Sequence, residues 1–422
     1  MGDLLSLCLV VLVQIVLLTG LIYSLGCKDT CLSFPTFMPI YMAMSAALSG
    51  TFLAGDLFNF FVFAELLVIS ATILTAISDD NRGVESALKY YLISTIASIC
   101  MLIAIGTFYS LYGTLNLAQI SLSIQSGGNQ PLLSLGIILL VAAFLIKGAV
   151  FPFHFWQPDF HAVSPTPVSA MLSSVVVKVG VYGIIRVTTL IIPHQKMWLQ
   201  SGLIILGVMS VLYAGFSAIG AQNVKRMLAY STIGQIGFIV IAIGWGTPLS
   251  LCAALVFTVN HAFAKAAMLM LSGLVGSRLK PKSTDYEAIQ GTGKELRLAG
   301  LLFMLGGISL AGLPPLNGFW GKYLVLRATI ESGEYFVVAL LAFGSILSLI
   351  YLFRGFQTIW WKSPLSEPYL KKDKDSWIAP FILIVLCFIL GVWIEPLVSF
   401  GNLIAQSLLD PMHYISIFPF VH

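Results

Sequence analysis

The sequence predicts an all-α polytopic membrane protein with about 12 transmembrane helices. Hydrophobic residues make up 58% of the 422 residues and charged residues only 9%, and the mean hydropathy is +0.95. Soluble domains carry about 25% charged residues, so this chain has too little polar surface to cover a soluble core. In addition, runs of about 20 apolar residues, the length that crosses a bilayer, recur along the whole chain.

The first apolar run, residues 4–26, is too long for a signal peptide core, and no small-residue cleavage site follows it. We therefore expect a retained first span. The full set of predicted spans is 4–26, 35–54, 56–78, 85–110, 131–155, 164–190, 197–220, 226–245, 249–276, 298–330, 336–360 and 377–398. The tail from Ser399 to His422 has shorter apolar runs and is expected to lie along the surface.

Twelve crossings would put both termini on one side of the membrane, and the basic residues predict which side. One set of loops holds fifteen cations: Lys28, Arg82, Lys89, Lys225, Arg226, Arg278, Lys280, Lys282, Lys294, Arg297, Arg354, Lys362, Lys371, Lys372 and Lys374. The other set holds Arg186, Lys196 and Arg327. Because basic loops face the cytoplasm, we expect both termini outside. The net charge of +4 reflects this topology and makes no case for nucleic acid.

Five ionisable side chains fall in the middle of spans: Glu65, Lys147, Lys178, Lys265 and Lys322. A charge at the centre of a spanning helix costs roughly 2.5–3.5 kcal/mol, so such groups normally face a bundle interior or a hydrated path. Snorkelling to an interface is the alternative for any one lysine, and it does not account for all five. The pattern indicates ion or proton movement.

Two spans are interrupted next to a lysine. Gly148 and Pro152 follow Lys147, and Pro314 and Pro315 precede Lys322. Proline removes a helical hydrogen bond, and freed backbone groups at membrane depth must be satisfied by protein or by a hydrated cavity. A single break could be a packing kink, but one broken span in each half of the chain is typical of inverted-repeat transporters.

Neither the cysteines nor the histidines have the spacing of a metal site. Cys27 and Cys31 are close in sequence but fall in a loop assigned to the cytoplasm, where a disulfide is disfavoured. His154 and His161 lack a matching pair on another helix, which argues against haem. We therefore expect no cofactor and no metal in this chain.

Five strings carry a family resemblance: AGDLFNFFVFAELLVIS, IKGAVFPFHFWQPDFHAVSPTPVSAMLSSVVVKVGVYGIIR, NVKRMLAYSTIGQIGF, VNHAFAKAAMLMLSGLV and AGLPPLNGFWGKYLVL. They resemble the antiporter-like subunits shared by complex I, energy-converting membrane hydrogenases and multisubunit Mrp-type sodium/proton antiporters. GDLFNFFVF and YGTLNLAQIS are most similar to the D-type Mrp subunit and its hydrogenase counterparts. The resemblance covers residues 35–360.

The resemblance implies roles for the buried charges. Glu65 matches the essential glutamate of the family's fifth helix, and Lys147 matches its partner on the broken seventh helix. Lys178 matches the lysine of the eighth helix. The linking pair of the second half matches His261 and Lys265, which are four residues apart and share one helical face. Lys322 matches the terminal lysine or glutamate of the broken twelfth helix.

The chain departs from the family at its N-terminus. Family members usually have fourteen helices, and counting back from Glu65 leaves the first two unaccounted for. A separate polypeptide or a neighbouring subunit could take their place. The expected organisation is residues 1–34 as an N-terminal helix and loop, 35–190 and 197–360 as two antiporter-like inverted repeats, and 361–422 as a cytoplasmic loop, a last helix and a surface tail.

The expected mechanism is charge coupling. A lysine beside a glutamate keeps its proton, and loss of that countercharge makes the buried ammonium costly, so a proton can leave. His261 suits a relay because imidazole titrates near neutral pH. A structural salt bridge is the alternative for Glu65 and Lys147.

Three functional classes remain open from the sequence. The chain is expected to be an ion-translocating subunit of an Mrp-type Na+/H+ antiporter in a prokaryotic plasma membrane, with other membrane subunits as partners and protons, or also sodium, as the ions. The second class is the same module in a complex I-like hydrogenase or quinone reductase, where other subunits would hold the redox cofactors. The third is a structural subunit without transport.

Overall fold

The computed structural model describes residues 2–27, 29–78, 80–126, 131–192, 197–365 and 375–417, which are almost entirely helical. The helices of the first half are α1 (Leu4–Leu25), α2 (Phe37–Leu53), α3 (Leu57–Ala76), α4 (Asn81–Tyr112), α5 (Leu117–Ser126), α6 (Pro131–Lys147), α7 (Trp156–Val163), α8 (Thr166–Met171) and α9 (Lys178–Arg186). Those of the second half are α10 (Met197–Gly220), α11 (Val224–Trp245), α12 (Pro248–Ser277), α13 (Tyr286–Ile289), α14 (Arg297–Ala311), α15 (Asn317–Glu331), α16 (Tyr335–Phe356), α17 (Ile378–Val392), α18 (Glu395–Leu409) and α19 (Pro411–Ile417). Single π-helical turns at Leu172–Val176, Val187–Ile191 and Gln357–Trp361 and 3₁₀ turns at Thr30–Ser33 and Thr292–Glu295 complete the described elements.

Polar side chains fix where several helices begin. The first amide groups of a helix have no partner within it, so a side-chain oxygen just before the helix stabilises its start. Asp56 accepts from the amides of Phe58 and Asn59 at the start of α3. Asn223 accepts from the amide of Arg226 at the start of α11.

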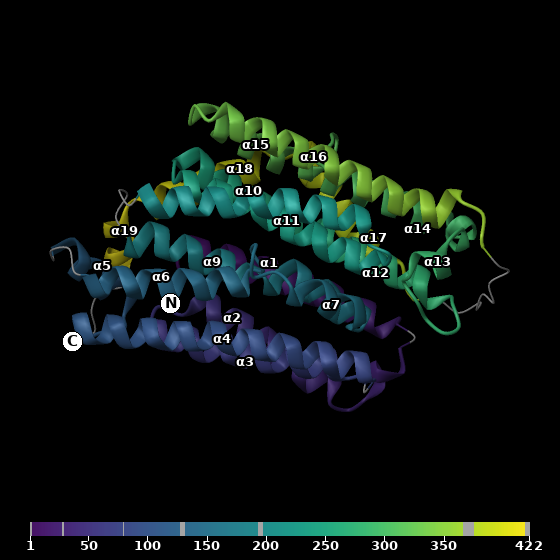
Figure 1. The fold of residues 1–422 in the computed structure, drawn as a ribbon, viewed down its shortest axis with the longest axis horizontal. Helices are drawn as coiled ribbons and strands as arrows, with labels where there is room; N and C mark the ends of the chain where they lie inside the picture. The colour runs from purple at the N-terminus through teal and green to yellow at the C-terminus, as the bar shows by residue number, and fades with distance from the viewer. Residues whose placement is uncertain are drawn as a thin grey trace.

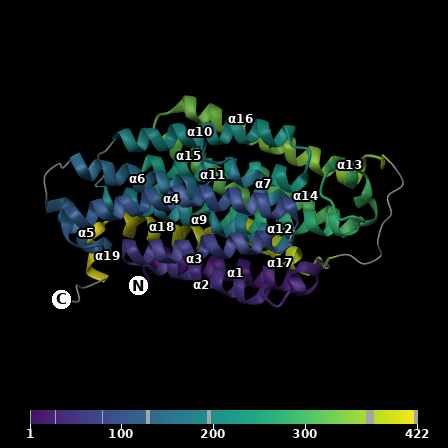
Figure 2. The ribbon, with the colours of Figure 1, turned by 60° about the horizontal axis from the view of Figure 1, so that its bottom comes forward.

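The long helices run roughly along the longest axis of the molecule (Figure 1). Helices α2 and α3 lie along one edge of the molecule, and α16 lies towards the opposite edge, as both ribbon views show (Figure 2). Helix α12 lies in the interior, and the most apolar stretches of α12 and of the continuous helical run Thr166–Ile191 are completely buried. These two central spans carry three of the expected site residues.

The described residues contain eight helices that are long and apolar enough to cross a membrane, or nine if the bent pair α17 and α18 is one span. Three further apolar helices are shorter: Phe37–Leu53, Leu132–Lys147 and Arg297–Ala311. The protein is therefore an all-α membrane protein, as the sequence predicted. The count of about 12 crossings remains a prediction, because the shorter helices fall below the length that crosses a bilayer unaided.

Both predicted interruptions are real breaks in the helices. Helix α6 ends at Lys147 and α7 begins at Trp156, with Gly148 and Pro152 in the turns between them. Helix α14 ends at Ala311 and α15 begins at Asn317, with the two prolines between them. The expected span 298–330 is thus two helices.

The tail expected to lie along the surface contains helix α18, which is half-buried. Helix α18 bends by 80° from α17 and packs against α12, where Gly401 lies next to Cys252. The reason is an apolar face at helical spacing, formed by Gly401, Ile404, Ala405 and Leu408, all of which are buried. The length of an apolar run does not reveal such a face, so the sequence analysis did not predict this contact with α12, and the position of the tail relative to the membrane stays a prediction.

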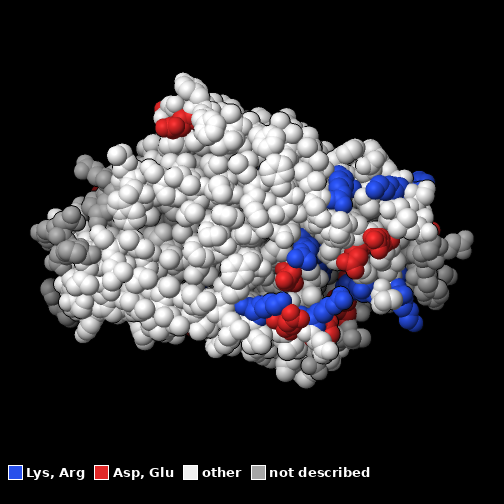
Figure 3. Space-filling model, in the orientation of Figure 1, with Lys and Arg blue, Asp and Glu red and all other residues white. Residues whose placement is uncertain are grey.

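Both ends of the described chain meet at one end of the molecule. The guanidinium group of Arg186 lies 2.5 Å from Asp3 at the start of α1 and 5.0 Å from the ring centre of Tyr414 in α19. Most Lys and Arg visible in Figure 3 gather near the other end, mixed with Asp and Glu. The ion pairs Arg226–Asp159 and Lys282–Asp29 belong to that basic end. Of the cations counted above, Lys28, Lys196, Lys371, Lys372 and Lys374 lie outside the described residues.

Candidate functional site

The first expected pair lies between α3, α4 and α6. Glu65 Oε1 is 3.5 Å from Lys147 Nζ, and the hydroxyl of Ser98 donates a hydrogen bond to the same carboxylate oxygen. The Lys147 side chain is only 8% exposed and that of Glu65 is 29% exposed. Among the described residues, Lys147 Nζ has no hydrogen-bond partner within standard distance. The pair is thus a loose ion pair in apolar surroundings, which can be altered without breaking a tight hydrogen bond.

The second contact joins the two halves of the chain. Lys178 at the start of α9 and His261 in the middle of α12 are both buried, and Lys178 Nζ is 2.9 Å from His261 Nδ1. An ammonium has no lone pair, so a charged Lys178 donates and Nδ1 accepts. The other ring nitrogen, Nε2, has no partner among the described residues and belongs to a ring that lines a small cavity.

Lys265 is completely buried one turn beyond His261. Its Nζ donates to the carbonyl oxygen of Leu228 at 3.1 Å and to Ser231 Oγ at 2.7 Å, and both acceptors lie on α11. Ser231 also accepts a hydrogen bond of 2.8 Å from the hydroxyl of Tyr351 on α16. The lysine therefore has polar partners but no carboxylate among the described residues to balance its charge.

Lys322 depends directly on the second helix break. Its Nζ donates to the carbonyl oxygen of Ala311 at 2.8 Å and to Ser348 Oγ at 2.7 Å, and lies 5.2 Å from the ring centre of Phe238. Ala311 is the last residue of α14, so its carbonyl has no helical donor. Gly312 has φ +82°, and a Cβ there would lie 2.5 Å from Cδ of Lys322. The break supplies both an acceptor and the space for the lysine.

The expected residues form contacts in pairs. Among the residues that the structure describes, hydrogen bonds or ion pairs join Glu65 to Lys147 and Lys178 to His261, but none joins Lys147 to Lys178 or Lys265 to Lys322. Four lysines and one carboxylate in a low-dielectric interior are electrostatically coupled, because charges attract and repel strongly there.

Small polar residues between the lysines escaped the sequence analysis. Gln235 lines two cavities of about 10 Å³ each, one beside His261 and one beside Ser231, Ser348 and Tyr351. Each holds roughly one water molecule by volume. The signal was present in the sequence, since Ser231 and Gln235 are four residues apart on one face of an apolar helix.

A metal site finds no support in the described part of the chain. It contains no group of three or more His, Cys, Asp or Glu side chains that could hold a metal ion. The side chains of the expected site, which are carboxylate, ammonium, imidazole and hydroxyl groups, can form hydrogen bonds and, for the first three, gain or lose a proton.

Residues 54–348 match the family described as NADH:quinone oxidoreductase/Mrp antiporter, transmembrane. The chain is 32% identical over 375 residues to the D-type subunit of the Na+/H+ antiporter of Bacillus subtilis, covering 88% of this chain and 75% of the relative. The chain belongs to this family. Glu65, Lys147, Lys178, His261, Lys265 and Lys322 all lie within the matched residues.

One further relative and two solved structures are also similar to this chain. The D-type subunit of the Na+/H+ antiporter of Alkalihalophilus pseudofirmus is 29% identical over 416 residues, which cover 98% of this chain and 84% of the relative. A chain of the Mrp complex from Dietzia has the same fold, with a TM-score of 0.90 at 22% identity over 98% of this chain and 85% of that one. A chain of an archaeal membrane-bound sulfane sulfur reductase, a respiratory membrane complex, has a TM-score of 0.88 at 28% identity over 98% of this chain and 84% of that one.

Proposed function

We propose that this chain is an ion-translocating membrane subunit of a multisubunit Na+/H+ antiporter and that protons move along its buried charges. The observation that carries the proposal is the set of four buried lysines in apolar spans. A buried charge costs free energy in a membrane, and such residues usually mark an ion or proton path. The relatives named as D-type Na+/H+ antiporter subunits support the choice of antiport. The path comprises Glu65, Lys147, Lys178, His261, Lys265 and Lys322.

Transport begins at the loose ion pair. When Glu65 takes up a proton, Lys147 loses its countercharge and the electric field along this path changes. Lys178 then passes a proton to Nδ1 of His261 along the 2.9 Å contact, which needs no movement of heavy atoms. The imidazole releases a proton from Nε2 towards Lys265, and Lys322 completes the path.

The same proposal includes the setting of the chain. The subunit lies in the plasma membrane of a prokaryote with both termini outside and the basic end in the cytoplasm, on the balance of cations in its loops. Its partners are further membrane subunits of the complex. Sodium, where it is exchanged, requires several converging oxygen ligands.

A redox-driven pump is the second candidate, favoured by the likeness to the archaeal respiratory complex at 28% identity. In that case electron transfer occurs in other subunits and this chain alone is inactive. Purification of the native complex with identification of its subunits separates the two candidates. An iron–sulfur or hydrogenase-like subunit supports the redox pump, whereas membrane subunits alone support antiport.

The central test removes the first pair. We expect Glu65→Ala and Lys147→Ala each to abolish coupled transport while the complex still assembles, because each removes one member of the ion pair. The measurement is the formation of a pH gradient in vesicles that hold equal amounts of complex. Lys89→Ala is the control, since Lys89 forms an exposed ion pair with Glu85. Near-normal transport in both variants would favour a structural subunit.

A further inference from the structure

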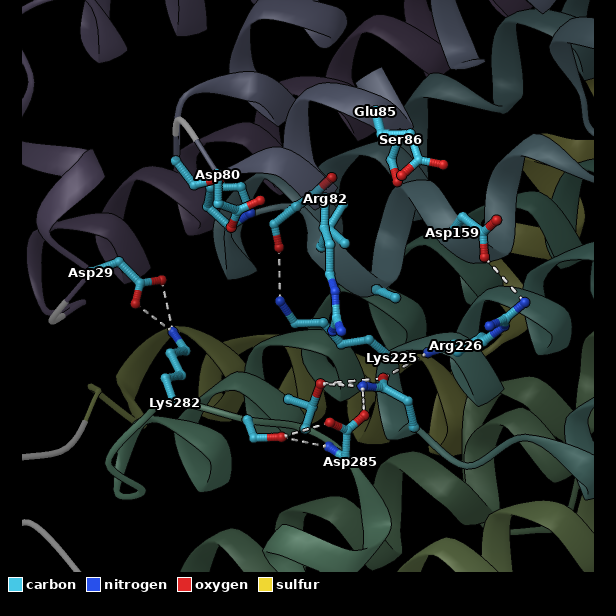
Figure 4. A pocket seen from close by; sticks show the side chains of 18 of the residues that line it. Asp29, Asp80, Arg82, Glu85, Ser86, Asp159, Lys225, Arg226, Lys282 and Asp285 are labelled. Carbon is cyan, nitrogen blue, oxygen red and sulfur yellow. Dashed lines mark hydrogen bonds and ion pairs between the residues drawn. The ribbon is translucent and has the colours of Figure 1, made fainter. Parts of the chain in front are cut away.

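A large polar pocket opens at the basic end of the molecule. It has a volume of about 650 Å³, which is within the usual range for small-molecule sites, and α4, α7, the start of α11 and the segment before α13 form its walls (Figure 4). Five cations and five carboxylates line it. The lining is therefore balanced in total charge, and what the pocket can bind depends on which of these groups already have partners.

All five carboxylates of the pocket have partners within the protein. Three of them form ion pairs with cations of the lining, which are Lys89–Glu85 at 2.6 Å, Arg226–Asp159 at 3.1 Å and Lys282–Asp29 at 2.7 Å. The other two accept hydrogen bonds, Asp80 from the amide of Gly83 and Asp285 from the side-chain amide of Asn223. Two of the five cations are thus left without a countercharge.

Arg82 and Lys225 are these two cations. Among the described residues, neither has a carboxylate within ion-pair distance. Lys225 is only 5% exposed and donates one of its three ammonium hydrogens to the carbonyl oxygen of Ser164 at 2.8 Å, so two hydrogens have no acceptor in the described part of the chain. Figure 4 shows the Arg82 side chain pointing from α4 towards Lys225. Two cations in this arrangement repel each other unless an anion lies between them.

The unpaired donors of the pocket suit a phosphate group. Besides the guanidinium of Arg82 and the ammonium of Lys225, the pocket is lined by Ser78, whose buried hydroxyl has no hydrogen-bond partner among the described residues. Guanidinium and ammonium groups are the side chains that proteins use most to bind phosphate, because charge-assisted hydrogen bonds are strong. The oxygens of a phosphate point in several directions, so one phosphate can accept from α4 and α11 together.

An apolar stripe on α4 continues from the pocket along a spanning helix. Lys89 lines the pocket, and Leu92 and Ile96 follow it after three and seven residues, which places them on the same helical face. Leu88, Leu92 and Ile96 are each more than half exposed. Because α4 is long and apolar enough to cross a membrane, this stripe lies where lipid chains would contact it. A ligand with both a phosphate and an apolar tail would contact the pocket and the stripe.

We propose that the pocket binds the headgroup of a phospholipid, with the phosphate between Arg82 and Lys225 and one acyl chain along Leu92 and Ile96. The pairs that neutralise the other cations keep the rest of the wall polar and wet, so the remainder of the headgroup lies among hydrogen-bonding groups. A soluble phosphate compound shares the headgroup chemistry but makes no use of the stripe. The site goes beyond the proposed function, because lipid binding does not depend on ion movement.

The test compares two photoreactive lipids on the complete complex in lipid nanodiscs. Phosphatidylglycerol and diacylglycerol carry the same acyl chain with a diazirine group, and mass spectrometry identifies the peptides to which each lipid is cross-linked. We expect phosphatidylglycerol to label α4 around Leu92 and Ile96. Diacylglycerol has no phosphate, so it should label this segment roughly tenfold less, as loss of charge-assisted hydrogen bonds does.

Substitutions of the two cations give a second, independent measurement. We expect Arg82→Gln and Lys225→Gln each to lower the labelling by phosphatidylglycerol about tenfold, because each removes one charged donor to the phosphate. Glutamine at residue 225 still has a donor for the carbonyl oxygen of Ser164. Arg297→Gln is the matched control: Arg297 is exposed at the start of α14 and does not line the pocket, so labelling of α4 should not change.

Equal labelling of α4 by the two lipids overturns the headgroup site, and this comparison needs no variant, so it holds even if a substitution prevents assembly. Labelling that neither Arg82→Gln nor Lys225→Gln changes also overturns it. Inorganic phosphate tests the soluble source. If it protects Arg82 from modification by phenylglyoxal and phosphatidylglycerol does not, the pocket binds a soluble phosphate compound and the assignment to a lipid is wrong.

Discussion

Lys322 shows how a buried lysine can be held without a carboxylate. Its two acceptors are a carbonyl oxygen that α14 leaves unpaired at Ala311 and the hydroxyl of Ser348. The sequence predicted that the lysine and the prolines belong together, because freed backbone groups at membrane depth need partners. It could not predict Ser348, since serine is common in apolar helices and its direction depends on how α16 packs.

These contacts sharpen what substitutions at residue 322 should do. We expect Lys322→Glu to keep partial transport, because a protonated glutamic acid can donate to Ala311 and remains titratable. Lys322→Leu should lose transport, since it leaves no group to carry a proton. Initial transport rates of both variants at matched expression decide the matter.

A purely structural lysine would produce the reverse order. The unpaired negative charge would then be at least as damaging as leucine, because an uncompensated buried charge is the costlier defect. Equal rates for Lys322→Leu and the unaltered protein would exclude Lys322 from the path.

At the scale of helices, the first break is stabilised by a close backbone approach. A Cβ on Gly180 in α9 would lie 2.5 Å from both the amide nitrogen of Gly148 and the carbonyl oxygen of Phe144. Only glycine permits this distance, which brings the end of α6, and with it Lys147, against α9. Prolines and glycines made the break predictable from the sequence. The contact between Gly148 and Gly180 could not be predicted, because it depends on how α6 and α9 pack.

We therefore expect Gly180→Ala to force α6 and α9 apart and to lower the stability of the complex by about 1–3 kcal/mol, as overpacking does. The thermal unfolding midpoint in detergent measures this change. Gly202→Ala in α10 is the control, because its Cβ would meet nothing within 4 Å. Alanine should stabilise that helix by roughly 0.5–1 kcal/mol. An equal midpoint for the two variants would show that the close approach is not needed.

The bend between α17 and α18 was not predicted from the sequence. Trp393 and Ile394 leave the helix, and Pro396 favours the first turn of a new one. These residues lie within or beside an apolar run whose hydropathy gives no sign of a bend. The direction of α18 is decided by its small apolar face against α12, which is a tertiary effect.

At the scale of the whole molecule, the segregation of charge agrees with a fixed orientation in the membrane. Arg186 ties the start of α1 and the last described helix to one end, whereas the pocket and its ion pairs lie at the other. The distribution of Lys and Arg among the loops predicted this separation, because it can be counted in the sequence without knowing how the helices pack. Which end faces the cytoplasm remains a prediction.

Site-directed labelling tests the orientation. In a background without native cysteines, we expect a thiol-reactive probe that cannot cross membranes to label Lys280→Cys only from the cytoplasm and Glu334→Cys only from outside. Both residues are exposed. Labelling of Lys280→Cys from outside would invert the topology.

Retaining Cys27 and Cys31 is a less disruptive alternative to removing every cysteine. Burial, aided by Asp29, raises the pKa of the Cys31 thiol to about 11, and burial with Asp375 raises the pKa of Cys27 well above its usual range. Thiolates are the reactive form, so both should give little background near neutral pH.

The two cavities beside Gln235 bear on selectivity. Each is about 10 Å³ and holds roughly one water molecule, so the stretch between His261 and Lys322 has no room for an ion that keeps a shell of several oxygen ligands. A proton needs only a hydrogen-bonded neighbour to move to. We propose that this narrowness favours protons over larger ions along the stretch between His261 and Lys322.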